Sequence, residues 1–268
     1  MIRLGTVLFL SLPLFLLCSS CKDNEEEKKA TMRISFSHKV DGELLQEDQM
    51  IYTNAAGNRY EVIEVMYFLS DLKLHRNDGT TVAPASWNDI HYVDTHIPST
   101  FLWTVPGEIP PGTYDSITFT FGIAKEKNKS FLFVNPPEVN MAWPDVLGGG
   151  YHYLMLNGWW RDLVGVRQSF NFHLGIGQIY QNNSGQVQDI IGFVHNAFTL
   201  TPTGPSFTIG SGQTLETELT MHLESWFSTP HVYDHNYWGG AIMQNQAAMQ
   251  VGCENGRDAF TVEYHQAE

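Results

Sequence analysis

Apolar and polar side chains alternate along much of the chain, and this pattern predicts β-strands. Residues 32–37 (MRISFS) and 114–122 (YDSITFTFG) alternate strictly, as expected for strands that bury one face. Residues 215–223 place leucine and methionine on one face and carboxylates, threonine and histidine on the other. Further strands are expected at residues 60–74, 90–93, 151–156, 169–174 and 192–200.

Turn residues and one helical pattern complete the expected architecture. Residues 77–79 (NDG), 135–137 (NPP) and 148–150 (GGG) interrupt the strand pattern, and Ser70-Asp71 mark a bend within the second strand. Only residues 241–251 have apolar side chains at helical spacing. Short strands, Gly/Pro turns and one late helix predict a mainly β fold: an antiparallel β-sandwich-like single domain with long loops and one short C-terminal helix.

The N-terminus has the pattern of an export signal. Residues 1–20 combine Arg3, an apolar run and two small serines before Cys21, which predicts a signal peptide too short to span a bilayer. The segment LCSSC resembles a bacterial lipoprotein box, in which Cys21 is lipidated and becomes the mature N-terminus. A redox or metal pair of Cys18 and Cys21 is the weaker alternative, since such motifs need a folded context.

Residues 21–31 are expected to form a solvated acidic tether, because this charged run has no apolar anchor. The run after Cys21 resembles the export signal of surface lipoproteins of the Bacteroidetes. We therefore expect an outer-membrane lipoprotein, periplasmic or surface-exposed and held in the membrane by lipid on Cys21, with residues 32–268 as its domain. Beyond the signal peptide only Cys21 and Cys253 remain. If Cys21 carries lipid, Cys253 has no partner, and no disulfide is expected within the chain.

Charge and motifs exclude several function classes. Fifteen Lys and Arg against 29 Asp and Glu give a net charge of −14 without a basic cluster, so nucleic acid is not an expected partner. The sequence has no Gly-x-Ser-x-Gly elbow, His-Glu-x-x-His helix, phosphate-binding loop or dinucleotide fingerprint. We expect a protein that is not an enzyme; a glycosidase-type carboxylate pair is the remaining catalytic alternative.

Histidine is the residue type that indicates chemistry. The chain has eleven, and neutral imidazole is a common ligand of copper and zinc. His173 falls on the strand face opposite Phe170 and Phe172, so a loop covering that face would make it a ligand, whereas otherwise it hydrogen-bonds a carbonyl. His152 lies between two tyrosines, and His38 directly follows the first strand.

Other candidate donors have equally plausible structural roles. His231 and His235 would share one face of a helix, or lie in a solvated loop. Met243 and Met249 suit Cu(I) or fill a core. Cys253 has no neighbour that would lower its pKa.

Several segments, in their order along the chain, resemble the MbnP-like family of copper-associated exported proteins. The matching segments cover most of residues 32–262: residues 36–42 (FSHKVDG), 52–57, 65–74 (VMYFLSDLKL), 111–123 (PGTYDSITFTFGI), 141–144 (MAWP), 150–151 and 172–175 (FHLG).

The resemblance implies a mostly β copper binder whose site combines histidines with a tryptophan oxidised to kynurenine by a dihaem peroxidase-like partner. It implies copper as the bound metal, acquisition or homeostasis as the role, and an outer-membrane transporter as a further partner. His38 and His173 lie in matching motifs, and His152 is added on chemical grounds. The Trp-x-His spacing of one relative is absent. Trp87, four residues before His91, is the nearest substitute, so Trp87 is the candidate modified tryptophan and His91 the fourth candidate ligand; Trp143 lies in the matching MAWP segment.

A surface interaction or glycan-binding module without metal is the alternative. Such a module would present exposed aromatic rings as flat platforms, and the candidates are Trp103, Trp159, Trp160 and Trp238. Flat exposure of these rings without convergent imidazoles would favour this alternative.

Overall fold

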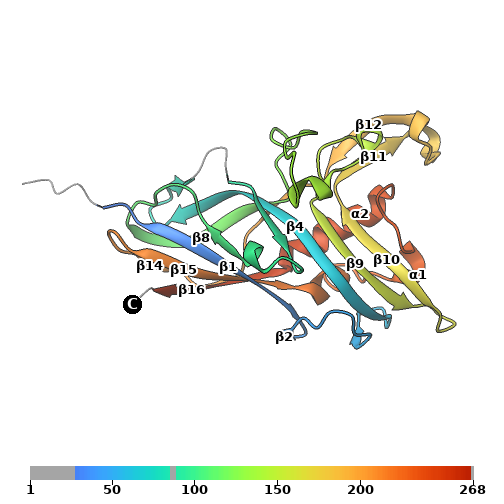
Figure 1. Ribbon diagram of the computed structural model, residues 1–268, viewed down its shortest axis with the longest axis horizontal. Coiled ribbons are helices and arrows are strands. Elements are labelled where there is room, and N and C mark those ends of the chain that lie inside the picture. Colours follow the sequence, from blue (N-terminus) through green and yellow to red (C-terminus); the bar gives the residue numbers. More distant parts are fainter. Residues whose placement is uncertain (1–27, 85–88, 267–268) are drawn as a thin grey trace, which may run out of the picture.

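Two β-sheets packed face to face form the body of the protein (Figure 1). The computed structural model describes residues 28–84 and 89–266. Tyr67 of the larger sheet joins the two layers, because its ring centroid lies 6.4 Å from that of Phe36 and 6.2 Å from that of Phe260 in the smaller sheet. The expected mainly β, sandwich-like fold is confirmed. The signal peptide, Cys21 and Trp87 lie outside the described residues.

The smaller sheet has the strand order β16-β15-β1-β2, and β7 also pairs with β1. Its members are β1 (Thr31–Val40), β2 (Glu43–Leu44), β7 (Leu102–Thr104), β15 (Thr214–His222) and β16 (Phe260–Gln266). β1 and β15 run parallel, whereas the sequence predicted antiparallel strands. The long stretch of chain between them supplies the crossover connection that a parallel pair requires.

The larger sheet has the order β10-β9-β4-β8-β13, with shorter strands paired to β4 and β8. Its members are β3 (Tyr52–Thr53), β4 (Arg59–Arg76), β5 (Thr81–Val82), β6 (His91–Asp94), β8 (Gly112–Phe121), β9 (Leu154–Arg161), β10 (Arg167–Leu174), β13 (Phe198–Leu200) and β14 (Phe207–Ile209). The expected bend at Ser70 and Asp71 is a bulge: the register with β8 shifts there, Asp71 has a φ of 52°, and β4 continues through it.

The remaining elements differ from expectation mainly at their ends. β11 (Ile176–Tyr180) and β12 (Ile190–His195) form a separate hairpin that follows β10 (Figure 1), so the strand expected at residues 192–200 is divided between β12 and β13. α1 (His235–Trp238) is one turn long, and α2 is Gln246–Asn255. α2 begins later than the expected residue 241 because the Asn245 side chain accepts a hydrogen bond from the Ala248 N–H and caps it.

No helix within residues 28–84 and 89–266 is long and apolar enough to cross a membrane.

Candidate metal centre

A folded loop covers the outer face of β9 and β10. It contains two short 3₁₀ turns, Glu138–Met141 and Asp145–Leu147, followed by three glycines with positive φ. The Trp143 N–H donates to the carbonyl of Gly150 (2.8 Å), and the His152 N–H donates to the carbonyl of Met141 (2.7 Å). These bonds hold residues 151–153 out of the strand that sequence predicts from residue 151, so β9 begins at Leu154.

The loop brings His152 against His173. Phe172 packs inward against Phe227 and Tyr233, and His173 therefore points to the outer, loop-covered face of β10. The ring centroids of His152 and His173 are 5.1 Å apart and the rings are perpendicular. Both side chains are buried. We call these two residues the imidazole pair.

Each imidazole of the pair uses one nitrogen and leaves the other without a partner. Nδ1 of His152 lies 2.9 Å from the Met141 carbonyl oxygen, and Nε2 of His173 lies 2.8 Å from Oδ1 of Asn157. Both acceptors require an N–H, which assigns the proton to these nitrogens. Nε2 of His152 and Nδ1 of His173 then carry lone pairs, and both atoms are buried without a hydrogen-bond partner among the described residues.

Burial keeps both rings neutral. It lowers the pKa of His152 to about 4, against which the carbonyls of Met141 and Ala142 act weakly. It lowers the pKa of His173 to about 3, and the neighbouring His152 lowers it further. Buried imidazole nitrogens without a partner are an uncompensated cost in a protein interior, and each of these two is a neutral nitrogen donor of the kind that binds metal ions.

Trp143 contacts the imidazole pair, and Met155 lies on the same strand face. The Trp143 ring meets His152 edge-on at 4.6 Å between centroids, and its Nε1–H donates to the Leu147 carbonyl. Gly175 makes room for it, since a Cβ there would lie 2.5 Å from the indole. Met155 is opposite His173 in the β9–β10 register and therefore shares its face, which offers a soft thioether on the same side of the sheet.

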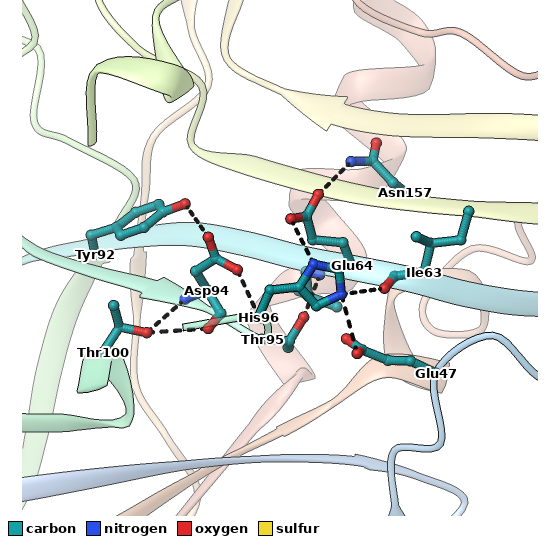
Figure 2. A network of polar contacts seen from close by, with 10 residues as sticks. Glu47, Ile63, Glu64, Tyr92, Asp94, Thr95, His96, Thr100 and Asn157 are labelled. Carbon is teal, nitrogen blue, oxygen red and sulfur yellow. Dashed lines mark hydrogen bonds and ion pairs between the residues drawn. The ribbon is translucent and has the colours of Figure 1, made fainter. Parts of the chain in front are cut away.

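Asn157 connects the imidazole pair to a polar network on the same sheet (Figure 2). Its Nδ2 donates to Oε2 of Glu64 at 3.5 Å while its Oδ1 accepts from His173. Glu64 in turn contacts Nδ1 of His96 at 3.2 Å. This carboxylate–amide–imidazole chain fixes the ring orientation of His173, which is the usual function of residues hydrogen-bonded to metal-ligating histidines.

His96 itself lies at the centre of a group that sequence reasoning missed. One ligand atom each from Glu64, Asp94 and His96 falls within 4.8 Å of the others. Nε2 of His96 contacts the Ile63 carbonyl (3.0 Å) and Glu47 (3.3 Å), so both ring nitrogens have partners. Although partial burial opposes it, Glu47 and Glu64 raise the pKa of His96. We interpret this group as an imidazolium held between carboxylates, brought together by the pairing of β4 with β6.

His38 lies on the other side of the larger sheet from the imidazole pair. Its ring is 5.7 Å from that of Tyr67 on β4. Met66, which precedes Tyr67 on β4, is paired with Met155 on β9, and Met155 is paired with His173 on β10. These three side chains therefore share the outer face of the sheet. Because successive residues of a strand point to opposite faces, His38 is on the inner side of β4 and His173 on the outer side.

His91 is likewise remote from the pair. Its ring is stacked between Phe36 (5.1 Å) and Trp103 (5.2 Å), and its Nε2–H donates to the Thr100 carbonyl at 2.8 Å. Burial lowers its pKa to about 4, against the opposing effect of that carbonyl. The four candidate histidines thus form one pair and two separate side chains rather than one cluster.

His231, His235 and Cys253 each contact protein groups and do not form a shared metal site. His231 is exposed and contacts Glu254, whereas His235 is fully buried and stacked on Phe170 at 4.5 Å, so these two histidines do not share an exposed face. The thiol of Cys253 contacts the Asn196 carbonyl at 3.4 Å, and burial raises its pKa to about 12.

The tryptophans proposed as sugar platforms are not flat exposed rings. Trp103 and Trp160 are buried, and the partly buried Trp159 ring is covered by the guanidinium of Arg167 at 4.3 Å. Trp238 is partly buried and packs against the core. The alternative of a glycan-binding surface therefore loses the feature on which it depended.

The family of the chain follows from its sequence as a whole. Residues 29–245 match the family model for MbnP. The chain belongs to the MbnP family. The fold of this family member is also similar to that of MbnP from Methylosinus trichosporium, with a TM-score of 0.56 and 14% sequence identity over 88% of this chain and 99% of that one. No curated protein matches it at a significant level.

Within this MbnP family member, sequence reasoning identified both members of the imidazole pair but not their surroundings. The matching MAWP segment contained Trp143, whose contact with His152 depends on the fold of the covering loop. Asn157 had no signal of its own, because its role depends on its register opposite Asn171 and beside Glu64 in neighbouring strands.

Proposed function

We propose that this protein binds copper through Nε2 of His152 and Nδ1 of His173, as a cell-envelope protein for copper acquisition or homeostasis. The observation that supports the site most directly is the pair of adjacent buried imidazoles, each with one satisfied N–H and one unpartnered nitrogen. Membership of the MbnP family supports the choice of metal, since the resemblance of the sequence to this family implies copper.

The donor set fits copper better than the harder divalent ions. Imidazole nitrogen suits Cu(I), Cu(II) and Zn(II), and copper binds such sites more tightly than zinc. Met155, on the same face as His173, adds the thioether type that favours Cu(I). Since both rings are already neutral at pH 7, binding need not displace a ring proton, in contrast to the usual histidine site.

The surroundings of the pair define its access and its chemistry. A cavity of about 290 Å³ is lined by Trp143 and Tyr151 together with residues of the covering loop. Trp143 itself is buried, and its ring contacts the imidazole of His152 at 4.6 Å between centroids. Trp143 is therefore the residue at which we expect the tryptophan oxidation that the family resemblance implies, with a dihaem peroxidase-like protein as the oxidising partner.

The proposal extends to location and role. Lipid on Cys21 would hold the domain at the outer membrane, in the periplasm or at the cell surface, where an outer-membrane transporter is the expected recipient or donor of copper. We propose a binding role rather than a catalytic one, because the pair is enclosed by the covering loop and both histidines are 6–7% exposed.

Copper titration of the mature protein tests the site. Cu(I) is added under reducing conditions against a competing chromogenic chelator, with His152→Leu and His173→Leu as site variants and His231→Gln as a control that removes an exposed histidine. We expect binding tighter than about 1 μM in the wild type and control, and a loss of at least tenfold in each site variant. Equal affinity in all four proteins would refute the assignment. Intact mass of protein purified from its own envelope reports tryptophan oxidation, and peptide mapping tests its assignment to Trp143.

A further inference from the structure

A second pocket lies on the inner side of β4, away from the imidazole pair. It has a volume of about 360 Å³, at the small end of the range for ligand sites. The sharp turn at Asp41 and Gly42, both with positive φ, folds β2 back along β1. The segment after β2 then covers His38, and the Leu45 N–H donates to the His38 carbonyl at 2.9 Å.

The lining combines an apolar wall with two unsatisfied polar groups. Phe36, Leu44, Leu45 and Phe101 supply the apolar surface, and His38 and Glu47 supply the polar groups. Nε2 of His38 and Oε1 of Glu47 are buried and have no hydrogen-bond partner among the described residues, and His38 is 5% exposed. Buried polar atoms are normally satisfied. The carboxylate oxygen of Glu47 only accepts, and Nε2 of a neutral His38 accepts when the ring proton is on Nδ1, so the two atoms suit a ligand that supplies donors.

The net charge around the pocket favours a positively charged ligand. Oε2 of Glu47 contacts His96, whose other ring nitrogen contacts Glu64 (Figure 2). Two carboxylates therefore share one imidazole, and the group is net negative even when His96 is protonated. His38 adds no opposing charge, because burial lowers its pKa to about 4.

We propose that this pocket binds a small organic cation, a primary ammonium carried on an aromatic or aliphatic body. The ammonium supplies several N–H donors, for the Glu47 carboxylate and for the lone pair of a neutral His38. Its body packs against the leucine and phenylalanine side chains, with Phe101 available for a cation–π contact. A bare metal ion would use the two polar groups but would leave the apolar wall without a function.

Calorimetric titration with three probes of similar shape tests the proposal: 2-phenylethylamine, 2-phenylethanol and 3-phenylpropionate, each added to the mature protein in the presence of a metal chelator. We expect the amine to bind about tenfold or more tightly than the alcohol and the acid. Comparable affinity for amine and alcohol, or no amine binding up to millimolar concentration, overturns it.

Variants separate this pocket from other surfaces. Glu47→Gln should weaken amine binding about tenfold and leave the alcohol unaffected, while Glu43→Gln, an exposed carboxylate of β2, should leave both unchanged. His152→Leu should also leave amine binding unchanged, since the imidazole pair is on the opposite side of β4. Amine binding that survives Glu47→Gln, or that is lost in His152→Leu, overturns the proposal whether or not copper binds at the pair.

Discussion

Replacing His152 by leucine should separate stability from copper binding. The substitution removes the buried Nε2 that has no partner, and an unsatisfied buried polar group costs about 1–3 kcal/mol. It also removes the Nδ1–H bond to the Met141 carbonyl, worth about 0.5–1.5 kcal/mol. That carbonyl still accepts from the backbone N–H of residue 152 at 2.7 Å, so no second group is left unsatisfied.

The two contributions predict an apo variant as stable as the wild type or more stable by about 1 kcal/mol. Copper at 100 times its dissociation constant should stabilise the wild type by about 2.7 kcal/mol. For a chain of this size that corresponds to a rise in Tm of about 5–10 °C. The variant should show little or no rise, since one of its two imidazole ligands is gone.

The assay combines urea unfolding of chelator-treated protein with thermal melts in Cu(I). His231→Gln is the matched control and should behave as the wild type in both. Destabilisation of the apo His152→Leu protein by more than about 3 kcal/mol would show that His152 stabilises the fold through contacts other than its hydrogen bond to the Met141 carbonyl. A full copper-dependent rise in Tm in the variant would refute the imidazole pair as the binding site.

Four further outcomes are expected. Copper affinity should be nearly constant from pH 8 to pH 5 and fall only near pH 4, because both rings of the imidazole pair are neutral above that value; competition titrations showing a tenfold loss between pH 7 and pH 6 would contradict this. Burial lowers the pKa of His235 to about 3 from 6.5, so the folded protein loses stability as pH falls below 6.5, and His235→Phe should flatten the slope of unfolding free energy by about 1.4 kcal/mol per pH unit between pH 6 and pH 4; identical slopes in urea unfolding would disprove it. Gly175→Ala should displace Trp143, lower stability by about 1–3 kcal/mol and weaken copper binding, as measured by melts and titration, and an unchanged Tm would contradict the packing described. Asn157→Leu should weaken copper binding about 10–100-fold by releasing the His173 ring, whereas unchanged affinity would show that the hydrogen bond does not position it.

The strand pattern was readable from sequence because each strand buries one face. Alternation located β1, β8, β10 and β15 to within a few residues. The bend at Ser70 and Asp71 was also predicted, but its form as a bulge within a continuous β4 was not, and neither was the division between β12 and β13, since both depend on neighbouring strands rather than on local composition. The parallel pairing of β1 with β15 joins segments far apart in the chain, and no local pattern encodes such a pairing.

The candidate site shows the same division. Alternation placed His173 on the face opposite Phe172, and this is a local property of one strand. Whether that face is open or covered depends on how residues 138–152 fold over it, and those contacts are made between distant backbone groups.

Periodicity thus established many of the elements and the face on which His173 points. Tertiary structure decided which faces meet: it joined His152 to His173, put His38 beyond β4, and brought Glu47 beside His96. The physical reason is that side-chain direction is set by local backbone geometry, whereas the proximity of two side chains depends on strand register and loop path, which the packing of the whole chain determines.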